Sequence, residues 1–413
     1  MALGLALMLV PPAAAAEITL LHSFSGKPDG RNPYGSPSLS GSTLYGMTGG
    51  GGAADCGIVY RLNTDGSAYR VLHAFTGPPS DGRGPAYTSP TVSNSTLYGV
   101  TWYGGAVNWG TIFKVSTDGS RYEVLYSFQE RLLTKGGVLP QGTLVVSGST
   151  VYGTAACGGR ENKGTVFRIG TDGSGFKVLH AFSGGRKDGD TPHGGLTLAG
   201  STLYGMTQKG GSNDYGTIYK LSTGGAAFAL LHTFTGQQGG DFPEGGLVLD
   251  AGTFYGMTSD WKAHGHGKIF RIGTDGGGFN VLHAFGGASD GRAPTGTLIL
   301  YNSALYGMTS SGGMGNQGTL FRINTDGGGF EVLHSFAGGA ETKGFTDAGL
   351  AQLKDLPCLE ELTLYGPGFT DAAVPQLMEL RGLKKVRLVD TGLKPATFDE
   401  LRRKAGQVQW LVE

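Results

Sequence analysis

Cysteine, net charge and long apolar segments are all scarce in this sequence. Its 413 residues include three cysteines, Cys56, Cys157 and Cys358, which lie far apart and show no CxxC spacing. A disulfide framework or a Cys-based zinc motif is therefore not predicted. A bridge between Cys56 and Cys157 is the pairing that an oxidising compartment would allow. Packing has to supply the stability of the fold.

Charge is low and balanced, with 32 basic and 32 acidic side chains and a formal net charge of zero. Nucleic-acid binding needs a basic face, so nucleic acid is not expected as the partner. The sequence also lacks the GxSxG, HExxH and Walker strings that mark common hydrolases, metalloproteases and nucleotide-binding proteins. No cofactor and no metal are predicted from these motifs.

No apolar run is long enough to predict a membrane span. Residues 1–16 are apolar and end in three alanines before Glu17, which is typical of a signal peptide, although a basic start is missing. The stretch from Met1 to Val10 is too short to span a membrane, and two prolines follow it. The sequence thus predicts a secreted, cell-surface or periplasmic protein with no span after signal removal.

Glycine, in contrast, is abundant, with 77 residues, and much of it belongs to an internal repeat. The pattern Leu-Tyr-Gly or a close variant occurs six times, and its tyrosines are 51 to 54 residues apart: Tyr45, Tyr98, Tyr152, Tyr204, Tyr255 and Tyr306. A second pattern, LHxF, follows the same period from His22 to His334, with Tyr126 in place of one histidine. Repeats of this length indicate a solenoid or a propeller.

Each repeat predicts four short strands, because its apolar runs are bounded by Gly and Asp-Gly turns. In the fourth copy these strands are Gly195–Leu198, Thr202–Thr207, Thr217–Leu221 and Phe228–Phe234. Four-stranded units of about 50 residues are typical of β-propeller blades. We predict an all-β fold over residues 17–340 with six blades, or with a seventh that is incomplete. The extra copy Ile18–Phe24 is expected to close the ring by pairing with the last blade.

The combination of LYGMT, GTxFRxxTDGxxF, VLHxF and DGxxPxG resembles the GloVer-type tandem repeat of bacterial "choice-of-anchor" exported proteins. The resemblance covers roughly residues 18–339. It implies a surface or secreted, propeller-like protein with a variable C-terminal anchor and no established activity. The connector Gln129–Pro140 departs from this pattern, so the third blade is expected to be locally irregular.

Residues 345–413 have a different composition, with less glycine and more charge. Phe345-Thr346-Asp347-Ala348 recurs 24 residues later as Phe369-Thr370-Asp371-Ala372. This period predicts a small α/β leucine-rich repeat module and resembles the bacterial TDAGL-type repeats. Because so few repeats bury only a small core, we expect the module to cap or dock rather than to form a binding horseshoe.

Residues that recur in every repeat are interpreted as structural. The LHxF histidines are expected to pack or to form hydrogen bonds between blades. The loop aspartates Asp29, Asp81, Asp188 and Asp290 are expected to hold turns through backbone N–H groups rather than to bind calcium. A functional site should instead break the symmetry, and it should lie on the side of the long loops.

Two loops break the symmetry. One carries Trp102, Tyr103 and Trp109, and the other carries Trp261, His264 and His266. Aromatic rings beside glycine-rich loops suit stacking on a sugar or holding a peptide, or they fill gaps at blade edges. The two histidines alternate along the chain and could share a metal, but no third ligand is evident. We take these six residues as the candidate binding site.

Three functions remain open. The first is an exported, monomeric, non-enzymatic propeller that binds a glycan or a protein through its long-loop face. The second is a carbohydrate-active hydrolase or lyase, which would need two carboxylates about 5 to 9 Å apart in a pocket. The third is a scaffold that displays the C-terminal module.

Overall fold

In the computed structural model, the described part of the chain comprises residues 19–336 except 86–87, 130–136, 237–238, 261–264 and 288. Beyond residue 336 it comprises residues 361–365, 371, 374–379, 384–389, 394, 397, 401, 403 and 408–412. The chain divides into two compact units, Met1–Phe336 and Ala337–Glu413. Each is described by itself.

Six four-stranded antiparallel sheets make up the first unit. The first contains β1 (Ser38–Ser40), β2 (Thr43–Thr48), β3 (Ile58–Asn63) and β4 (Arg70–Ala74). The second contains β6 (Thr91–Ser93), β7 (Thr96–Thr101), β9 (Thr111–Ser116) and β10 (Tyr122–Ser127). The third contains β11 (Val138–Ser147), β12 (Thr150–Cys157), β13 (Thr165–Gly170) and β14 (Lys177–Ala181).

The fourth sheet contains β16 (Thr197–Ala199), β17 (Thr202–Thr207), β19 (Thr217–Ser222) and β20 (Ala229–Thr233). The fifth contains β21 (Val248–Asp250), β22 (Thr253–Thr258), β23 (Lys268–Gly273) and β24 (Asn280–Ala284). The sixth contains β25 (Arg292–Tyr301), β26 (Ala304–Ser311), β27 (Thr319–Asn324) and β28 (Glu331–Ser335). Two small ladders join the loops: β5 (Gly82–Arg83) with β8 (Tyr103–Gly104), and β15 (Gly189–Asp190) with β18 (Lys209–Gly210).

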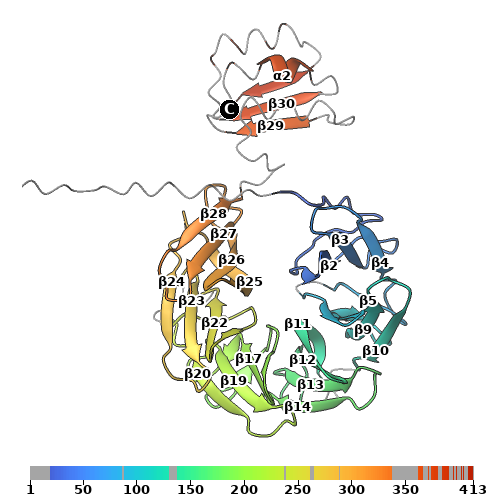
Figure 1. The fold of residues 1–413 in the computed structure, drawn as a ribbon, viewed down its shortest axis with the longest axis vertical. Helices are drawn as coiled ribbons and strands as arrows, with labels where there is room; N and C mark the ends of the chain where they lie inside the picture. Colours follow the sequence, from blue (N-terminus) through green and yellow to red (C-terminus); the bar gives the residue numbers. More distant parts are fainter. Residues whose placement is uncertain are drawn as a thin grey trace, which may run out of the picture. The chain divides into compact units, whose positions relative to one another are not determined.

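The six sheets follow one another around a ring (Figure 1), which confirms the prediction of a six-bladed β-propeller. We call the sheets blades one to six, and the strands of each blade A to D in chain order. Because neighbouring strands run antiparallel, the tight A–B and C–D turns lie at one end of every blade. The longer B–C and D–A loops lie at the other end, which we call the loop face.

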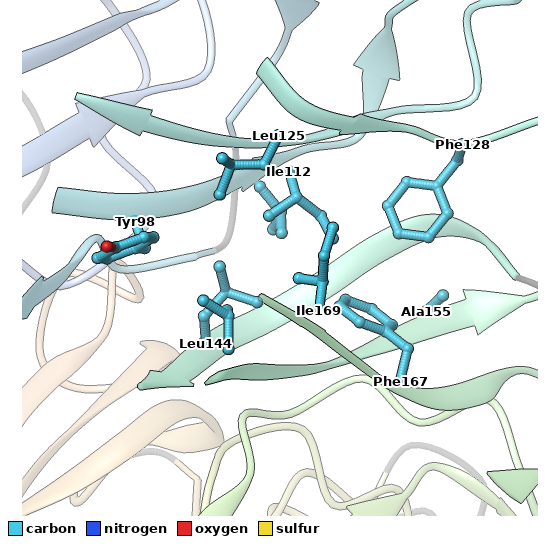
Figure 2. Packing of buried hydrophobic residues seen from close by; sticks show 10 residues of the cluster. Tyr98, Ile112, Leu125, Phe128, Leu144, Ala155, Phe167 and Ile169 are labelled. Carbon is cyan, nitrogen blue, oxygen red and sulfur yellow. The ribbon is translucent and has the colours of Figure 1, made fainter. Parts of the chain in front are cut away.

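The apolar core lies between blades rather than within them. Figure 2 shows one such layer, in which Tyr98, Ile112 and Leu125 of blade two meet Leu144 and Phe167 of blade three. Equivalent layers join the other consecutive blades from one to six. The Leu-Tyr-Gly pattern follows from this packing, since its tyrosine faces the next blade and its leucine faces the previous one. Its glycine is required because a Cβ on Gly153 would lie 2.6 Å from the Phe167 ring.

The first and sixth blades each have a face without this cover. Met308 is 48% exposed, whereas its counterpart Met257 in blade five is 3% exposed. Ile299 and Tyr301 on the sixth blade and Leu39 on the first are likewise exposed. We call these two faces the seam, which corresponds to the opening between β26 and β2 in Figure 1.

The expectation that the N-terminal copy closes the ring on the last blade is wrong. Described residues 19–24 form no strand, and Leu21 and Phe24 pack against Tyr60 and Leu62 of blade one. Phe24 contacts the Tyr60 ring at 5.1 Å, as Phe75 contacts Phe113 between blades one and two. The segment thus takes the place of a D strand from a preceding, otherwise missing blade. The favoured number of six blades stands, because residues 19–24 contribute no strand to a seventh.

The second unit contains a parallel sheet of β29 (Glu361–Tyr365), β30 (Lys385–Val389) and β31 (Gln409–Val412), with α2 (Val374–Glu379) between the first two strands. Glu361 pairs with Lys385, and Lys385 with Gln409, so each register step equals 24 residues. This step matches the period of the sequence. The leucine-rich repeat assignment itself stays a prediction.

Two further sequence expectations can be compared with the described residues. No disulfide joins Cys56 to Cys157, so the bridge between them does not form, while Cys358 lies outside the described residues. Among the described helices, none has the length and apolar character needed to cross a membrane.

Candidate functional site

The LHxF histidines form the joints between blades. Five of the six rings lie flat on an aromatic ring of the next blade, with centroids 3.5 to 3.9 Å apart and planes within 8° of parallel: His22 on Tyr69, His73 on Tyr122, His180 on Phe228, His232 on Phe279 and His283 on Phe330. Tyr126 takes the same place on Phe176. The predicted structural role of these histidines is confirmed.

The repeated loop aspartates hold the D–A loops. The Asp188 carboxylate lies 3.1 Å from His180 Nε2 and accepts N–H groups from Ser183 and Gly189. Burial alone would raise the pKa of Asp188, but these hydrogen bonds lower it below its usual value. Asp81 and Asp290 are held in the same way by backbone N–H groups and a histidine, and Asp29 accepts the Ser25 N–H and lies 3.4 Å from His22 Nε2. The turn-holding interpretation is therefore correct for all four.

The inner rim of the loop face is formed by the Pro-x-Gly segments that lead into the innermost strands. Their glycines lie against the backbone of the next blade: a Cβ on Gly194 would be 2.0 Å from the Gly245 oxygen, and one on Gly245 would be 1.8 Å from the Gly296 oxygen. The middle residues therefore follow one another around the rim. They differ in every described repeat: Tyr34, Gln141, His193, Glu244 and Thr295.

His193 and Glu244 are neighbouring titratable groups on this rim. Burial lowers the pKa of His193 to about 4, although a hydrogen bond to the Glu244 backbone opposes the shift. Burial also raises the pKa of Glu244 above its usual value. Gln208, at the end of β17, donates a long hydrogen bond from Nε2 to Glu244 Oε1, 3.4 Å away. The rim therefore presents a neutral imidazole, an amide and a weakly acidic carboxyl group.

Trp102 occupies the position in blade two that Gln208 occupies in blade four. The Trp102 carbonyl oxygen and Pro140 lie beside Gly110 just as the Gln208 oxygen and Pro243 lie beside Gly216. The Trp102 and Tyr103 rings meet edge to face, with centroids 6.4 Å apart. Tyr103 in β8 is 42% exposed. These two predicted aromatics therefore lie at the loop face, next to the rim.

The other four predicted site residues do not join this pair. Trp109 packs on the core between blades two and three, so it fills a gap at a blade edge. His266 is half-buried in the loop after β22, where its ring lies beside Gly287 and its carbonyl oxygen accepts the Ala293 N–H. Trp261 and His264 lie outside the described residues. Within the described part of the chain, no group of three His, Cys, Asp or Glu side chains is arranged to hold a metal ion.

Blade five contains a buried ion pair that sequence reasoning missed. Lys268 Nζ bonds to Asp260 Oδ2, and both side chains are almost fully buried. Asp260 Oδ1 also accepts the N–H of Asp241 and the hydroxyl of Thr258. A signal was present in the sequence, because Lys268 takes a position that is threonine in blades two, three, four and six: Thr111, Thr165, Thr217 and Thr319.

We define the rim site as Trp102, Tyr103, His193, Gln208 and Glu244. The sequence analysis found the first two and missed the last three. For His193 and Glu244, the signal was the variable middle residue of an otherwise repeated Pro-x-Gly segment. For Gln208, it was the variable residue that follows the buried threonine at the end of strand B. In the described repeats, the side chains at these positions differ from blade to blade.

Several solved structures resemble this chain distantly. A chain of a nidogen/laminin complex is 14% identical, covering 72% of this chain and 93% of that one, with a TM-score of 0.44. An oligogalacturonate lyase in complex with manganese is 13% identical, covering 76% and 80%, with a TM-score of 0.49. TolB from Acinetobacter baumannii is 19% identical, covering 66% and 58%, with a TM-score of 0.41. No curated protein sequence matches.

A family model describes the repeat itself. The model of the Gloeobacter/Verrucomicrobia repeat matches residues 9–207 and residues 140–367, which together include all six blades. The match agrees with the repeated strands, the interblade tyrosines and the histidine stacks described above. This chain therefore belongs to the family of the Gloeobacter/Verrucomicrobia repeat.

Proposed function

We propose that this protein is a non-enzymatic binding protein that takes a glycan at the rim site on its loop face. One observation carries the proposal: exposed Tyr103, beside Trp102, lies next to a rim whose residues differ from blade to blade. A large ring offers a flat apolar surface, and neutral polar groups beside it can bond to hydroxyl groups. Sugar rings combine both kinds of surface.

The state of the carboxylates favours binding over hydrolysis. Asp81, Asp188 and Asp290 are already bonded to histidine and backbone N–H groups, and Asp260 is paired with Lys268. A glycosidase needs one carboxyl group as acid and a second as base or nucleophile. Glu244 supplies one such group at the rim, and the described rim residues supply no second.

The binding proposal is tested by glycan-array screening of the intact protein, followed by titration of any ligand found. Trp102→Ala and Tyr103→Ala should each weaken binding by at least tenfold, as truncation of an aromatic anchor does. Tyr301→Ala is the matched control, because Tyr301 is also an exposed tyrosine but lies beside the A–B turn at the opposite end of its blade. Equal binding by all three variants would refute the rim site.

We also propose that the protein acts outside the cytoplasm, on the strength of the apolar segment 1–16 and the alanines before Glu17. Expression in a bacterial host and mass measurement of the exported product test this idea. The expected product begins at Glu17. Full-length protein that stays in the cytoplasmic fraction would contradict the proposal.

A further inference from the structure

The segment of residues 19–24 lies where a D strand would lie. At each joint between consecutive blades, the glycine of the C–D turn lies close to the D strand of the preceding blade. A Cβ on Gly119 of blade two, for example, would be 3.1 Å from the Leu72 oxygen in β4. A Cβ on Gly66 of blade one would likewise be 2.8 Å from the Leu21 oxygen. Blade one therefore contacts this segment as blade two contacts β4.

The strand that a D strand pairs with is missing beside this segment. In each of the six blades strand D pairs with strand C, and Val71 of β4 lies opposite Tyr60 of β3. No described strand pairs with residues 19–24. Leu20 takes the position of Val71 in the repeat, but it is 77% exposed, whereas Val71 is half-buried. The segment thus has the position of a D strand without a C strand to cover Leu20.

Blade six has the complementary exposed face. In the layer between blades five and six, Leu305 of strand B and Phe321 of strand C pack in one cluster with Met257. Met308 takes the position of Met257 in blade six and is 48% exposed, and Ile299 beside it is 62% exposed. The cover that this face lacks is therefore a leucine and an aromatic residue from the B and C strands of a following blade.

Both observations describe one object. A sheet between blade six and residues 19–24 would cover the face of blade six and would also pair with the segment. We propose that the seam binds a three-stranded antiparallel β-sheet of a partner protein, apolar on both faces, whose edge strand pairs with residues 19–24. The partner takes the place of strands A to C of a seventh blade. Such strand addition is held by main-chain hydrogen bonds, and alternate side chains give it specificity.

Continuity with the existing joints favours this partner over a second copy of the chain. Five apolar layers already join the six blades, and each buries the face of one sheet against the next. The C strand of every blade is already paired with strands B and D of its own sheet. A second folded copy therefore has no C strand to offer to residues 19–24. The seam shares no residue with the rim site, so this proposal does not depend on glycan binding.

A probe for the partner can be taken from the chain itself. Residues 183–222 contain the D–A loop before blade four and its strands A to C, and they would be made as a fusion to a soluble carrier. Calorimetric titration of this probe into the intact protein should show saturable binding with a negative heat-capacity change, because apolar surface is buried. The carrier alone should not bind. A soluble probe that does not bind would overturn the proposal.

Two methionines of blade six show whether binding occurs at the seam. Met308→Lys should weaken binding of the probe by about tenfold or more, since a lysine is poorly accommodated in an apolar layer. Met314→Lys is the matched control, because Met314 is 93% exposed but lies in the loop after β26, outside the seam. It should leave binding unchanged. Equal affinities of the two variants would refute binding at the seam.

An insertion into the full chain keeps the test decisive if the free probe aggregates. Phe336 follows the D strand of blade six as Phe182 follows that of blade three, so residues 183–222 inserted after Phe336 continue the repeat in register. This insertion should raise the Tm on the order of 2 °C or more. The same insert with lysine at the copies of Leu203 and Leu221, which pack towards the preceding blade, should give no such rise. Equal Tm values of the two insertion variants would contradict the proposal.

Sedimentation of the intact protein alone tests the other occupant. The wild type and Met308→Lys should both be monomeric, because the proposed sheet comes from a different protein. A larger species of the wild type that Met308→Lys dissociates would overturn the proposal, since the seam would then hold a second copy. Trp102→Ala should bind the probe as the wild type does, so failure at the seam is distinct from failure of the glycan proposal.

Discussion

The imidazole of His73 in blade one lies flat on the phenol ring of Tyr122 in blade two, with centroids 3.5 Å apart and planes 5° from parallel. Both side chains also bond to one carboxylate, that of Asp81: His73 Nε2 lies 3.0 Å from Oδ2, and the Tyr122 hydroxyl donates to Oδ1 at 2.5 Å. A stack and a shared anion thus join the two blades. The same stack recurs at each joint between consecutive blades.

This arrangement predicts that stability falls in acid. Burial alone would raise the pKa of Asp81, but hydrogen bonds from His73, Tyr122 and backbone N–H groups outweigh it and lower the pKa to about 2. An aspartate in the unfolded chain has a pKa of about 4. The stabilisation is therefore complete above about pH 4 and is lost as the pH falls to about 2, by on the order of 1 to 2 kcal/mol after solvent screening. In Asp81→Asn, the urea concentration at the midpoint of unfolding should therefore change less with pH in that window than it does in the wild type.

The control for this prediction is Asp65→Asn, since the Asp65 carboxylate caps an exposed C–D turn by accepting the Ser67 N–H. An acid dependence as steep in Asp81→Asn as in the wild type would contradict the role given to Asp81.

Removing one member of the buried pair in blade five should be costly. Lys268→Ala leaves Asp260 buried without its cation, and we expect a loss of roughly 3 to 5 kcal/mol in the free energy of unfolding. Lys268→Thr combined with Asp260→Ser installs the residues of blade six, Thr319 and Ser311, at these positions. This double variant should lose less of the free energy of unfolding than Lys268→Ala does, and we expect the difference to be about 1 kcal/mol or more. A larger loss in the double variant would show that the pair does not act as a unit.

Two methionines at equivalent positions in blades five and six test whether the face of blade six at the seam is uncovered. Met257→Ala should lower the free energy of unfolding by about 2 to 4 kcal/mol, because it leaves a cavity between blades five and six. Met308→Ala should change it by less than about 0.5 kcal/mol, since the sixth blade exposes this residue. Urea unfolding measures both. Equal losses would show that the face of blade six is covered in solution.

Much of the fold could be predicted because the same strand and turn patterns occur in six repeats of the sequence. Period-two apolar runs gave the strands, and in the fourth copy the predicted strand Thr202–Thr207 agrees with β17. Asp-Gly turns fixed the hairpins: Asp172, for example, accepts the N–H of Ser174. The roles of the histidines and loop aspartates followed from the same repetition, since residues present in every blade serve the packing of every blade.

The candidate site was only half predictable. Trp102 and Tyr103 stand out by residue type, and the loop face followed from strand direction. Trp109 has the same residue type but lies in the core between blades. His193 and Glu244 are ordinary residues in sequence and became neighbours only when adjacent Pro-x-Gly segments packed together. Sequence spacing does not distinguish a residue on the rim from one that fills a gap.

The sequence by itself determined the repeat, the four strands of each blade and the number of complete blades, because strands, turns and interblade packing depend on residues within one period. Only the tertiary structure decided where the N-terminal copy lies, which faces stay uncovered at the seam, and that His232 has a neighbour in Phe279 but no aspartate. These features depend on contacts between residues from different repeats. Such contacts arise when the blades pack around the ring, and no local pattern encodes them.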